Sequence, residues 1–305
     1  MTKEDCKMID ILFPYYGDVE MMKKAVHSVL NQTYQKWRLL VFDDGYPSDE
    51  PECFFTELIA KELEVRGASR IVYQKNAGNL GANGNYRKAL YHATSEYYCM
   101  MGADDMMKPD FLEKFMDYLK SGNECDIYQP GVEVINEFDA VYLPLVDWCK
   151  HLIEPKRSGL YQSEYIANSL IRGDWLYFPS VIWKTAVAKK VDFNQRFDVV
   201  QDLTMALDII QNGGTLFFDK NNVTFQYRRH SGSDSSVRAV NGYRFNEERE
   251  LFLWKASQFE KLGWKTAART AKRHVLSRLN ALTVLPMAIR SEKGEPKELL
   301  KHVLR

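Results

Sequence analysis

The first 128 residues alternate short apolar runs with segments in which apolar residues recur at helical spacing. The predicted strands are Ile9–Phe13, Arg38–Phe42, Ile71–Tyr73, Tyr97–Met101 and a further one that contains Ile127. The predicted helices between them run from Asp18 to about Leu30, over Glu52–Val65 and Asn83–Ala93, and from Pro109 to about Leu119. Strands separated by helices pair in parallel, so the pattern predicts an α/β fold, a mainly parallel sheet covered by helices on both faces.

The remaining chain follows a looser pattern. Residues 130–240 mix Gly, Pro and aromatic residues, with a predicted helix at Gln201–Gln211, a strand at Thr215–Phe218 and a polar loop at Tyr227–Ser236. From Tyr243 the sequence reads as helical to Leu282, Pro286 interrupts it, and Pro296–Leu304 forms a last short helix. We therefore expect one α/β domain over residues 1–240 and a helical extension over 241–305.

Charge is distributed unevenly along the chain, although the formal net charge is +0. Residues 261–305 carry 11 Lys and Arg against 3 Asp and Glu, a charge of +8, which leaves −8 on residues 1–260. A basic tail indicates contact with an anionic partner such as a membrane surface, or else a solvated helix face. The five cysteines form no CxxC pair, and no apolar run reaches the roughly 20 residues of a membrane span. We expect a cytoplasmic protein.

Two acidic pairs follow predicted strands. Asp43 and Asp44 precede Gly45, and Asp104 and Asp105 follow the strand that ends at Met101. In parallel sheets ligands bind beyond the carboxyl ends of the strands, where both pairs lie. Carboxylates there supply the oxygen ligands that Mg²⁺ and Mn²⁺ prefer, while a turn is the plainer interpretation of either pair alone. A dinucleotide-binding loop is excluded, because the turn after the first strand lacks GxGxxG.

Two further groups have the chemistry of a reactive site. Asp202 begins a predicted helix and is a candidate general base, with Asp198 and Asp208 as competitors that spacing does not separate. The Tyr227–His230 segment joins two arginines to a histidine, which suits an anion or a metal ion, or a solvated loop.

In their order these segments resemble the family 2 inverting glycosyltransferases of the GT-A fold, over roughly residues 8–236. The segments that carry the resemblance are SVLNQTYQKWRLLVFDDG (28–45), NAGNLGANGNYRKAL (76–90), EYYCMMGADDMMKPDFL (96–112), FDVVQDLTMAL (197–207) and YRRHSGSDSS (227–236). The resemblance implies a Rossmann-like nucleotide-binding half over about residues 1–128, an acceptor-binding half over about 129–240, and a helical basic C-terminal region over 241–305.

The resemblance also implies roles for individual residues. The nucleotide contacts fall on Pro14, Tyr15, Asp43, Asp44, Asn85, Ala103 and Asp104. The ligands of a divalent metal, Mn²⁺ or Mg²⁺, fall on Asp104, Asp105 and His230. The catalytic base falls on Asp202, and the acceptor contacts, by stacking on sugar rings, fall on Trp175 and Tyr177.

The implied reaction is metal-dependent transfer of a sugar from a nucleoside diphosphate to a hydroxyl of a glycan or lipid-linked acceptor, in surface polysaccharide synthesis. A UDP-sugar is the first expectation for the donor, with dTDP-rhamnose as the alternative; no nucleic acid partner is expected. Peripheral contact with the inner face of the plasma membrane is expected through residues 261–305, or else that region packs on the catalytic domain. Gly102 stands where many relatives have Asp, which keeps open a non-catalytic carbohydrate- or nucleotide-sugar-binding module.

Overall fold

The computed structural model describes residues 7–191, 193, 196–230, 239–292 and 294–304. A nine-stranded sheet runs in the order β3-β2-β1-β4-β8-β6-β9-β5, and β7 pairs with β9 beside this path. The strands are β1 (Ile9–Tyr15), β2 (Trp37–Asp43), β3 (Ile71–Lys75), β4 (Tyr97–Met100), β5 (Met106–Met107), β6 (Ile127–Ile135), β7 (Gly159–Gln162), β8 (Ile182–Lys184) and β9 (Thr215–Arg228).

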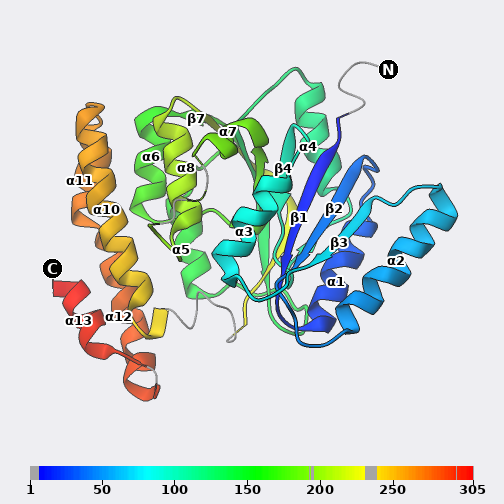
Figure 1. Cartoon of the computed structure of the whole chain (residues 1–305). Helices are drawn as coiled ribbons and strands as arrows, with labels where there is room; N and C mark the ends of the chain where they lie inside the picture. Colours follow the sequence, from blue (N-terminus) through cyan, green and yellow to red (C-terminus); the bar gives the residue numbers. More distant parts are fainter. Residues whose placement is uncertain (1–6, 192, 194–195, 231–238, 293, 305) are drawn as a thin grey trace.

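Helices cover the sheet on both faces (Figure 1). They are α1 (Val19–Leu30), α2 (Glu50–Arg66), α3 (Gly81–His92), α4 (Phe111–Lys120), α5 (Leu145–Ile153), α6 (Ser163–Arg172), α7 (Thr185–Val191), α8 (Gln201–Gln211), α10 (Tyr243–Lys261), α11 (Lys265–Arg273), α12 (Val275–Arg290) and α13 (Pro296–Leu304). The α/β architecture predicted from the sequence is confirmed.

Parallel pairing holds for most of the sheet. β3, β2, β1 and β4 are parallel neighbours, and β6 and β9 are parallel to each other. The short strand β8 lies antiparallel between β4 and β6, while β5 and β7 pair antiparallel with β9. The sheet is thus mixed, and the carboxyl ends of β1, β2, β4 and β6 share one edge, since two antiparallel steps restore the strand direction.

The core has one cluster on each face of the sheet. Along β1, Leu12 packs with the cluster under α6 and α8, whereas Ile11 and Phe13 pack with the cluster under α1 and α4. A strand that is buried on both sides has no solvent-facing side, which explains the apolar run from Ile11 to Tyr15 after the buried Asp10.

Three sequence predictions need correction. The strand expected to end at Phe218 continues to Arg228, because β9 pairs with β6 as far as Ile135, so Tyr227 and Arg228 lie in a strand rather than a loop. The long helix is three helices, broken at Gly263 and His274, whose φ angles of +76° and +33° stop the helical path. Pro286 lies inside α12, on its solvent side, where water can satisfy the carbonyl group that loses its partner.

The C-terminal helices form the outermost layer beside α6 and α8 (Figure 1). The amine of Lys255 in α10 is buried and lies 2.5 Å from the carboxylate of Asp208 in α8. Trp254 and Trp264 pack against the main core, so this part of the region faces the α/β domain. Within the described residues, none of the helices has the length and apolar character needed to cross a membrane.

Candidate active site

The Asp43–Asp44 pair ends β2 inside the protein. Asp43 is buried and accepts hydrogen bonds from the backbone N–H of Tyr46 (2.7 Å) and the hydroxyl of Tyr73 (2.5 Å). Asp44 is also buried and accepts from the side-chain amide of Asn76 and the backbone N–H of Leu80, both at 2.8 Å. The two carboxylates therefore fix the loops after β2 and β3, and these loops frame the carboxyl edge of the sheet.

Asn85 supports this frame from α3. Its amide donates to the carbonyl of Phe42 (2.7 Å), and its oxygen accepts from Asn76 (3.2 Å). Lys88, one turn later, donates to the amide oxygen of Asn76 at 2.6 Å. Both ends of the Asn85 amide are used within the protein, so any effect of Asn85 on a nucleotide is exerted through Asn76 and Asp44.

The end of β1 contributes an aromatic wall. Tyr15 is buried and its hydroxyl donates to the carbonyl of Gly17 (2.9 Å), while Pro14 is only partly buried. The rings of Tyr15 and Tyr16 both lie against Tyr46, at 5.4 and 5.8 Å between centroids. Tyr16 is 57% exposed, so it presents a free aromatic surface beside the acidic pair. Tyr15 was predicted as a nucleotide contact, whereas its ring neighbours Tyr16 and Tyr46 were not.

Asp104 and Asp105 follow β4 and differ in environment. Asp105 is buried, and its carboxylate accepts the backbone N–H of Arg228 at 2.8 Å. Burial raises its pKa well above the usual range, and the neighbouring charge of Asp104 adds to this. Asp104 is partly exposed, as is Ala103 beside it, and its carboxylate lies 2.9 Å from Nε2 of His230. That contact raises the pKa of His230.

Gly102 explains where the Asp105 carboxylate goes. A Cβ atom at residue 102 would lie 2.4 Å from one carboxylate oxygen of Asp105 and 3.0 Å from one of Asp104. The absence of a side chain at Gly102 thus leaves the space that Asp105 fills.

Arg228, at the end of β9, holds the loop that carries Asp104 and Asp105. The Arg228 guanidinium donates to the carbonyls of Asp104 (2.7 Å) and Asn136 (2.6 Å) and pairs with Asp139 (2.5 Å). Its neighbour Arg229 pairs with the buried carboxylate of Asp147. The sequence suggested an external anion or a solvated loop for these arginines, whereas both are paired with protein carboxylates. The serines of the YRRHSGSDSS segment lie outside the described residues.

Asp202 occupies the first turn of α8. Its carboxylate accepts the backbone N–H of Leu203 (2.7 Å), and it lines a small cavity together with Asp174, Phe178 and Trp183. Burial raises the pKa of Asp202 to about 7, and the charge of Asp174 is the second cause.

The competing carboxylates are engaged elsewhere. Asp208 pairs with Lys255, and Asp198 accepts from the side-chain amide of Asn83 (2.6 Å) and the hydroxyl of Tyr243 (3.1 Å). The contact with Asn83 also ties the segment before α8 to the start of α3, on the same edge of the sheet as Asp44.

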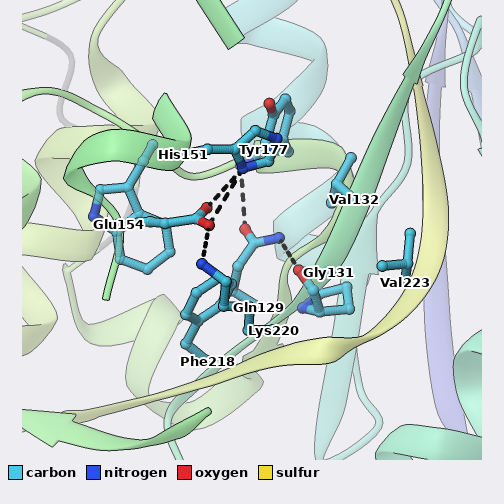
Figure 2. A pocket seen from close by; sticks show the side chains of 11 residues that line it. Gln129, Gly131, Val132, His151, Glu154, Tyr177, Phe218, Lys220 and Val223 are labelled. Carbon is cyan, nitrogen blue, oxygen red and sulfur yellow. Dashed lines mark hydrogen bonds and ion pairs between the residues drawn. The ribbon is translucent and has the colours of Figure 1, made fainter. Parts of the chain in front are cut away.

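A second cavity, of about 190 Å³, lies between α5 and the strands β6 and β9. Figure 2 shows His151 and Lys220 directed at the carboxylate of Glu154, with Nζ of Lys220 at 2.7 Å. A register shift after Pro130 makes room for it, because residues 220–222 of β9 have no partner in β6.

Trp175 and Tyr177 line this cavity but are themselves buried. Trp175 packs on Phe218 at 4.9 Å, and the amine of Lys150 lies 4.3 Å from the centre of the Tyr177 ring. The hydroxyl of Tyr177 donates to Asp147 at 2.9 Å. Stacking of these two side chains on sugar rings was predicted without these internal contacts. Because of them, only the ring atoms of Trp175 and Tyr177 that border the cavity are accessible.

Comparison with known proteins identifies the family. The family model for Glycosyl transferase family 2 matches residues 10–180. An uncharacterized glycosyltransferase of Methanocaldococcus jannaschii is 23% identical over 209 residues, which are 68% of this chain and 66% of that protein. One of Haemophilus influenzae is 22% identical over 77% of this chain and 69% of its own length. The matches thus span about two thirds of these relatives.

Solved structures agree on the fold. S. aureus TarS in complex with UDP-GlcNAc superposes with a TM-score of 0.69 at 14% identity, over 97% of this chain and 79% of that chain. The mannosyltransferase PcManGT of Pyrobaculum calidifontis, in complex with GDP-Man and Mn²⁺, gives a TM-score of 0.58 at 12% identity, with the same two coverages. With the fold and the family match together, the chain belongs to glycosyl transferase family 2 and has the GT-A fold.

Proposed function

We propose that the protein transfers a sugar from a nucleoside diphosphate to a hydroxyl group of a glycan or lipid-linked acceptor during surface polysaccharide synthesis. The observation that carries the proposal is that Asp43–Asp44 and Asp104–Asp105 follow parallel strands at one edge of the sheet. The segment before Asp202 is tied to the same edge by the contact between Asp198 and Asn83. Relatives support it: a putative teichuronic acid biosynthesis glycosyltransferase of Bacillus subtilis is 21% identical over 55% of this chain. Because TarS is seen with UDP-GlcNAc, a UDP-sugar is the first donor to test, and dTDP-rhamnose the next.

The nucleotide is proposed to lie over the ends of β1 and β2. Tyr16 offers an aromatic face there, and Pro14 and the backbone around Asp43 and Asp44 border the same place. Ala103 and Asp104 lie after β4, two strands from β2 and therefore roughly 10 Å away, which suits a ribose and a diphosphate.

A divalent metal ion, Mn²⁺ or Mg²⁺, fits beside Asp104. No group of three or more His, Cys, Asp or Glu side chains converges among the described residues, so the protein by itself offers fewer ligands than a closed metal site has. Asp104 and His230 lie 2.9 Å apart and form a two-ligand set, and diphosphate oxygens complete such sets in proteins that bind Mg²⁺. When bound, the ion neutralises charge on the leaving diphosphate. Asp105, also predicted as a metal ligand, is buried and accepts the backbone N–H of Arg228, two residues before His230.

Asp202 is proposed as the general base that removes the proton of the acceptor hydroxyl. A pKa of about 7 leaves roughly half of its carboxyl groups ionised at neutral pH, which suits proton transfer at that pH. Trp175 and Tyr177 line the cavity of Figure 2, whereas Asp174, in the same segment, lines the small cavity at Asp202. We propose that it belongs to the acceptor side of the site.

The test is hydrolysis of a panel of nucleotide sugars, with Mn²⁺ or Mg²⁺, by the wild type and Asp202→Asn. Slow donor hydrolysis with one sugar nucleotide, lost in the variant, supports the transferase. Asp198→Asn is the matched control and keeps activity. Donor binding without turnover, whatever acceptor is supplied, would instead support a binding module on a GT-A fold.

A further inference from the structure

Helix α5 turns its apolar side chains outward. Leu145, Trp148 and Leu152 are 66%, 48% and 52% exposed, while Asp147 is buried and the amine of Lys150 donates to the carbonyl of Leu176 (2.8 Å). A surface helix ordinarily has the reverse arrangement. The inward charges of α5, Asp147 and Lys150, contact Arg229 and the carbonyl of Leu176. Nothing in the described part of the chain covers its outward apolar residues.

The segment before α5 continues this surface. Phe138, Val141 and Leu143 are 78%, 61% and 53% exposed. Together with the three α5 residues they form what we call the apolar face: Phe138, Val141, Leu143, Leu145, Trp148 and Leu152. Contiguous apolar surface on one stretch of a soluble chain marks an interaction site.

The apolar face is fixed to the catalytic edge. The Arg228 guanidinium holds Asn136 and Asp139, on either side of Phe138, and it also holds the Asp104 carbonyl. Arg229 holds Asp147 within α5. β9 ends at Arg228, and Arg229 and His230 follow it directly, so the residues that hold the apolar face adjoin the proposed diphosphate position.

Basic residues border the apolar face. The Lys156 amine caps the end of α5 by donating to the carbonyls of His151 (3.3 Å) and Leu152 (3.1 Å), and Arg157 next to it is exposed. A Cβ on Gly173 would lie within 4 Å of side-chain atoms of both Ile153 and Leu276, so the start of α12 adjoins the end of α5.

The helix before α12 adds more positive charge. The exposed basic residues of α11 are Lys265, Arg269, Lys272 and Arg273. Positive charge therefore gathers at the end of the apolar face that adjoins α12, although Lys272 also pairs with Glu260. Apolar residues with basic residues beside them are the pattern of proteins that bind the interface of an anionic bilayer.

We propose that the apolar face docks into the interfacial layer of an anionic phospholipid bilayer and so sets the catalytic edge against the membrane. The sequence had placed membrane contact in residues 261–305, or else packing of that region on the catalytic domain. The proposed anchor is instead residues 138–152, although α12 also has exposed apolar side chains at Val275, Leu279 and Leu282. The inference rests on the proposed function in one respect: docking would give the enzyme access to a lipid-linked acceptor. Docking itself is measurable without any sugar nucleotide.

The experiment is sedimentation of the full chain with vesicles of equal parts phosphatidylglycerol and phosphatidylethanolamine, compared with phosphatidylcholine vesicles. We expect the wild type to sediment with the anionic vesicles and the double variant Leu145→Glu/Leu152→Glu to bind at least about tenfold more weakly. Val65→Glu is the matched control, because Val65 is 81% exposed but lies at the far end of α2. It keeps wild-type binding.

Trp148 supplies a direct readout, since it is more exposed than the other five tryptophans. Its emission shifts to the blue when the anionic vesicles are added, and Trp148→Phe removes this shift. Vesicle binding that persists in the double variant would overturn the proposal in favour of contact through the C-terminal helices. Dimers in ultracentrifugation without any vesicle binding would overturn it in favour of a second copy of the chain.

Donor hydrolysis without vesicles separates the two proposals. The double variant keeps hydrolysis and loses vesicle binding if both hold. Absence of hydrolysis in the wild type would count against the transferase alone, because the sedimentation result would still decide the docking.

Discussion

The acidity of Asp202 gives the sharpest prediction, and the perturbation is Asp174→Asn. Burial and the charge of Asp174 raise the pKa of Asp202 to about 7, against the opposing effect of the Leu203 N–H. If Asp202 acts as a base, activity follows its ionised fraction: about half at pH 7 and about a tenth at pH 6. The wild type should therefore lose activity about tenfold per pH unit on the acid side.

Asp174→Asn removes the neighbouring negative charge and keeps the shape of the side chain. The two carboxyl groups titrate as a pair, so the variant should show a single acid limb at lower pH. A displacement of one unit would raise activity at pH 6 from about a tenth to about half of its plateau. Because the plateau reports the fully ionised base, it should change less than the position of the limb.

The assay is the rate of donor hydrolysis from acid to alkaline pH, with saturating donor, for wild type, Asp174→Asn and Asp198→Asn. Asp198 is the control because its carboxylate is held by Asn83 and is not among the groups that shift Asp202. An acid limb that stays in place in Asp174→Asn, or moves to higher pH, would refute the reasoning. So would an unchanged limb in Asp202→Asn.

Four further predictions concern stability and metal binding. Asp10→Ala should cost about 3–5 kcal/mol in urea unfolding, since the buried Asp10 carboxylate accepts from Arg38, Thr94 and Ser95; a loss under 1 kcal/mol would contradict this. Asp147→Leu leaves Arg229 without its carboxylate and should destabilise the chain by a similar amount, which Arg229→Met in the same chain should partly restore. Gly102→Ala should displace the Asp105 carboxylate and weaken metal-dependent donor binding in calorimetry, whereas unchanged binding would show that Asp105 is free to move. Asp202→Asn should raise the melting temperature at pH 8 but hardly at pH 4, because a carboxyl group whose folded pKa is raised to about 7 costs stability as pH rises from its unfolded value of about 4; equal effects at both pH values would be inconsistent with that pKa.

The sequence predicted the frame of the site well, for a physical reason. Asp43 and Asp104 follow apolar runs that alternate with helices, and parallel strands bring their carboxyl ends to one edge. The partners of these residues were not predictable, because they come from distant segments. Arg228 reaches the carbonyl of Asp104 across 124 positions, and the sheet register alone determines that contact. Local pattern therefore indicated which residues lie at the edge but not what holds them.

The outward-facing apolar residues of α5 could not be predicted from the sequence. No helix was predicted from the sequence at Leu145–Ile153, and the apolar side chains of a surface helix usually face the core. The buried carboxylate of Asp147 reverses the helix, because pairing with Arg229 and Tyr177 takes its polar side inward. The residues near Asp147 in the sequence do not indicate that its partner is Arg229, which lies 82 positions away.

Donor binding by calorimetry tests the central claim most directly. A panel of nucleotide sugars is titrated into the wild type and Asp104→Asn, with and without Mn²⁺ or Mg²⁺. We predict that one donor binds only when the metal ion is present and that Asp104→Asn loses this binding, since Asp104 is the accessible carboxylate beside His230. Metal-independent binding of every donor, or binding that is equal in the variant, would contradict the account of a metal-dependent sugar-nucleotide site.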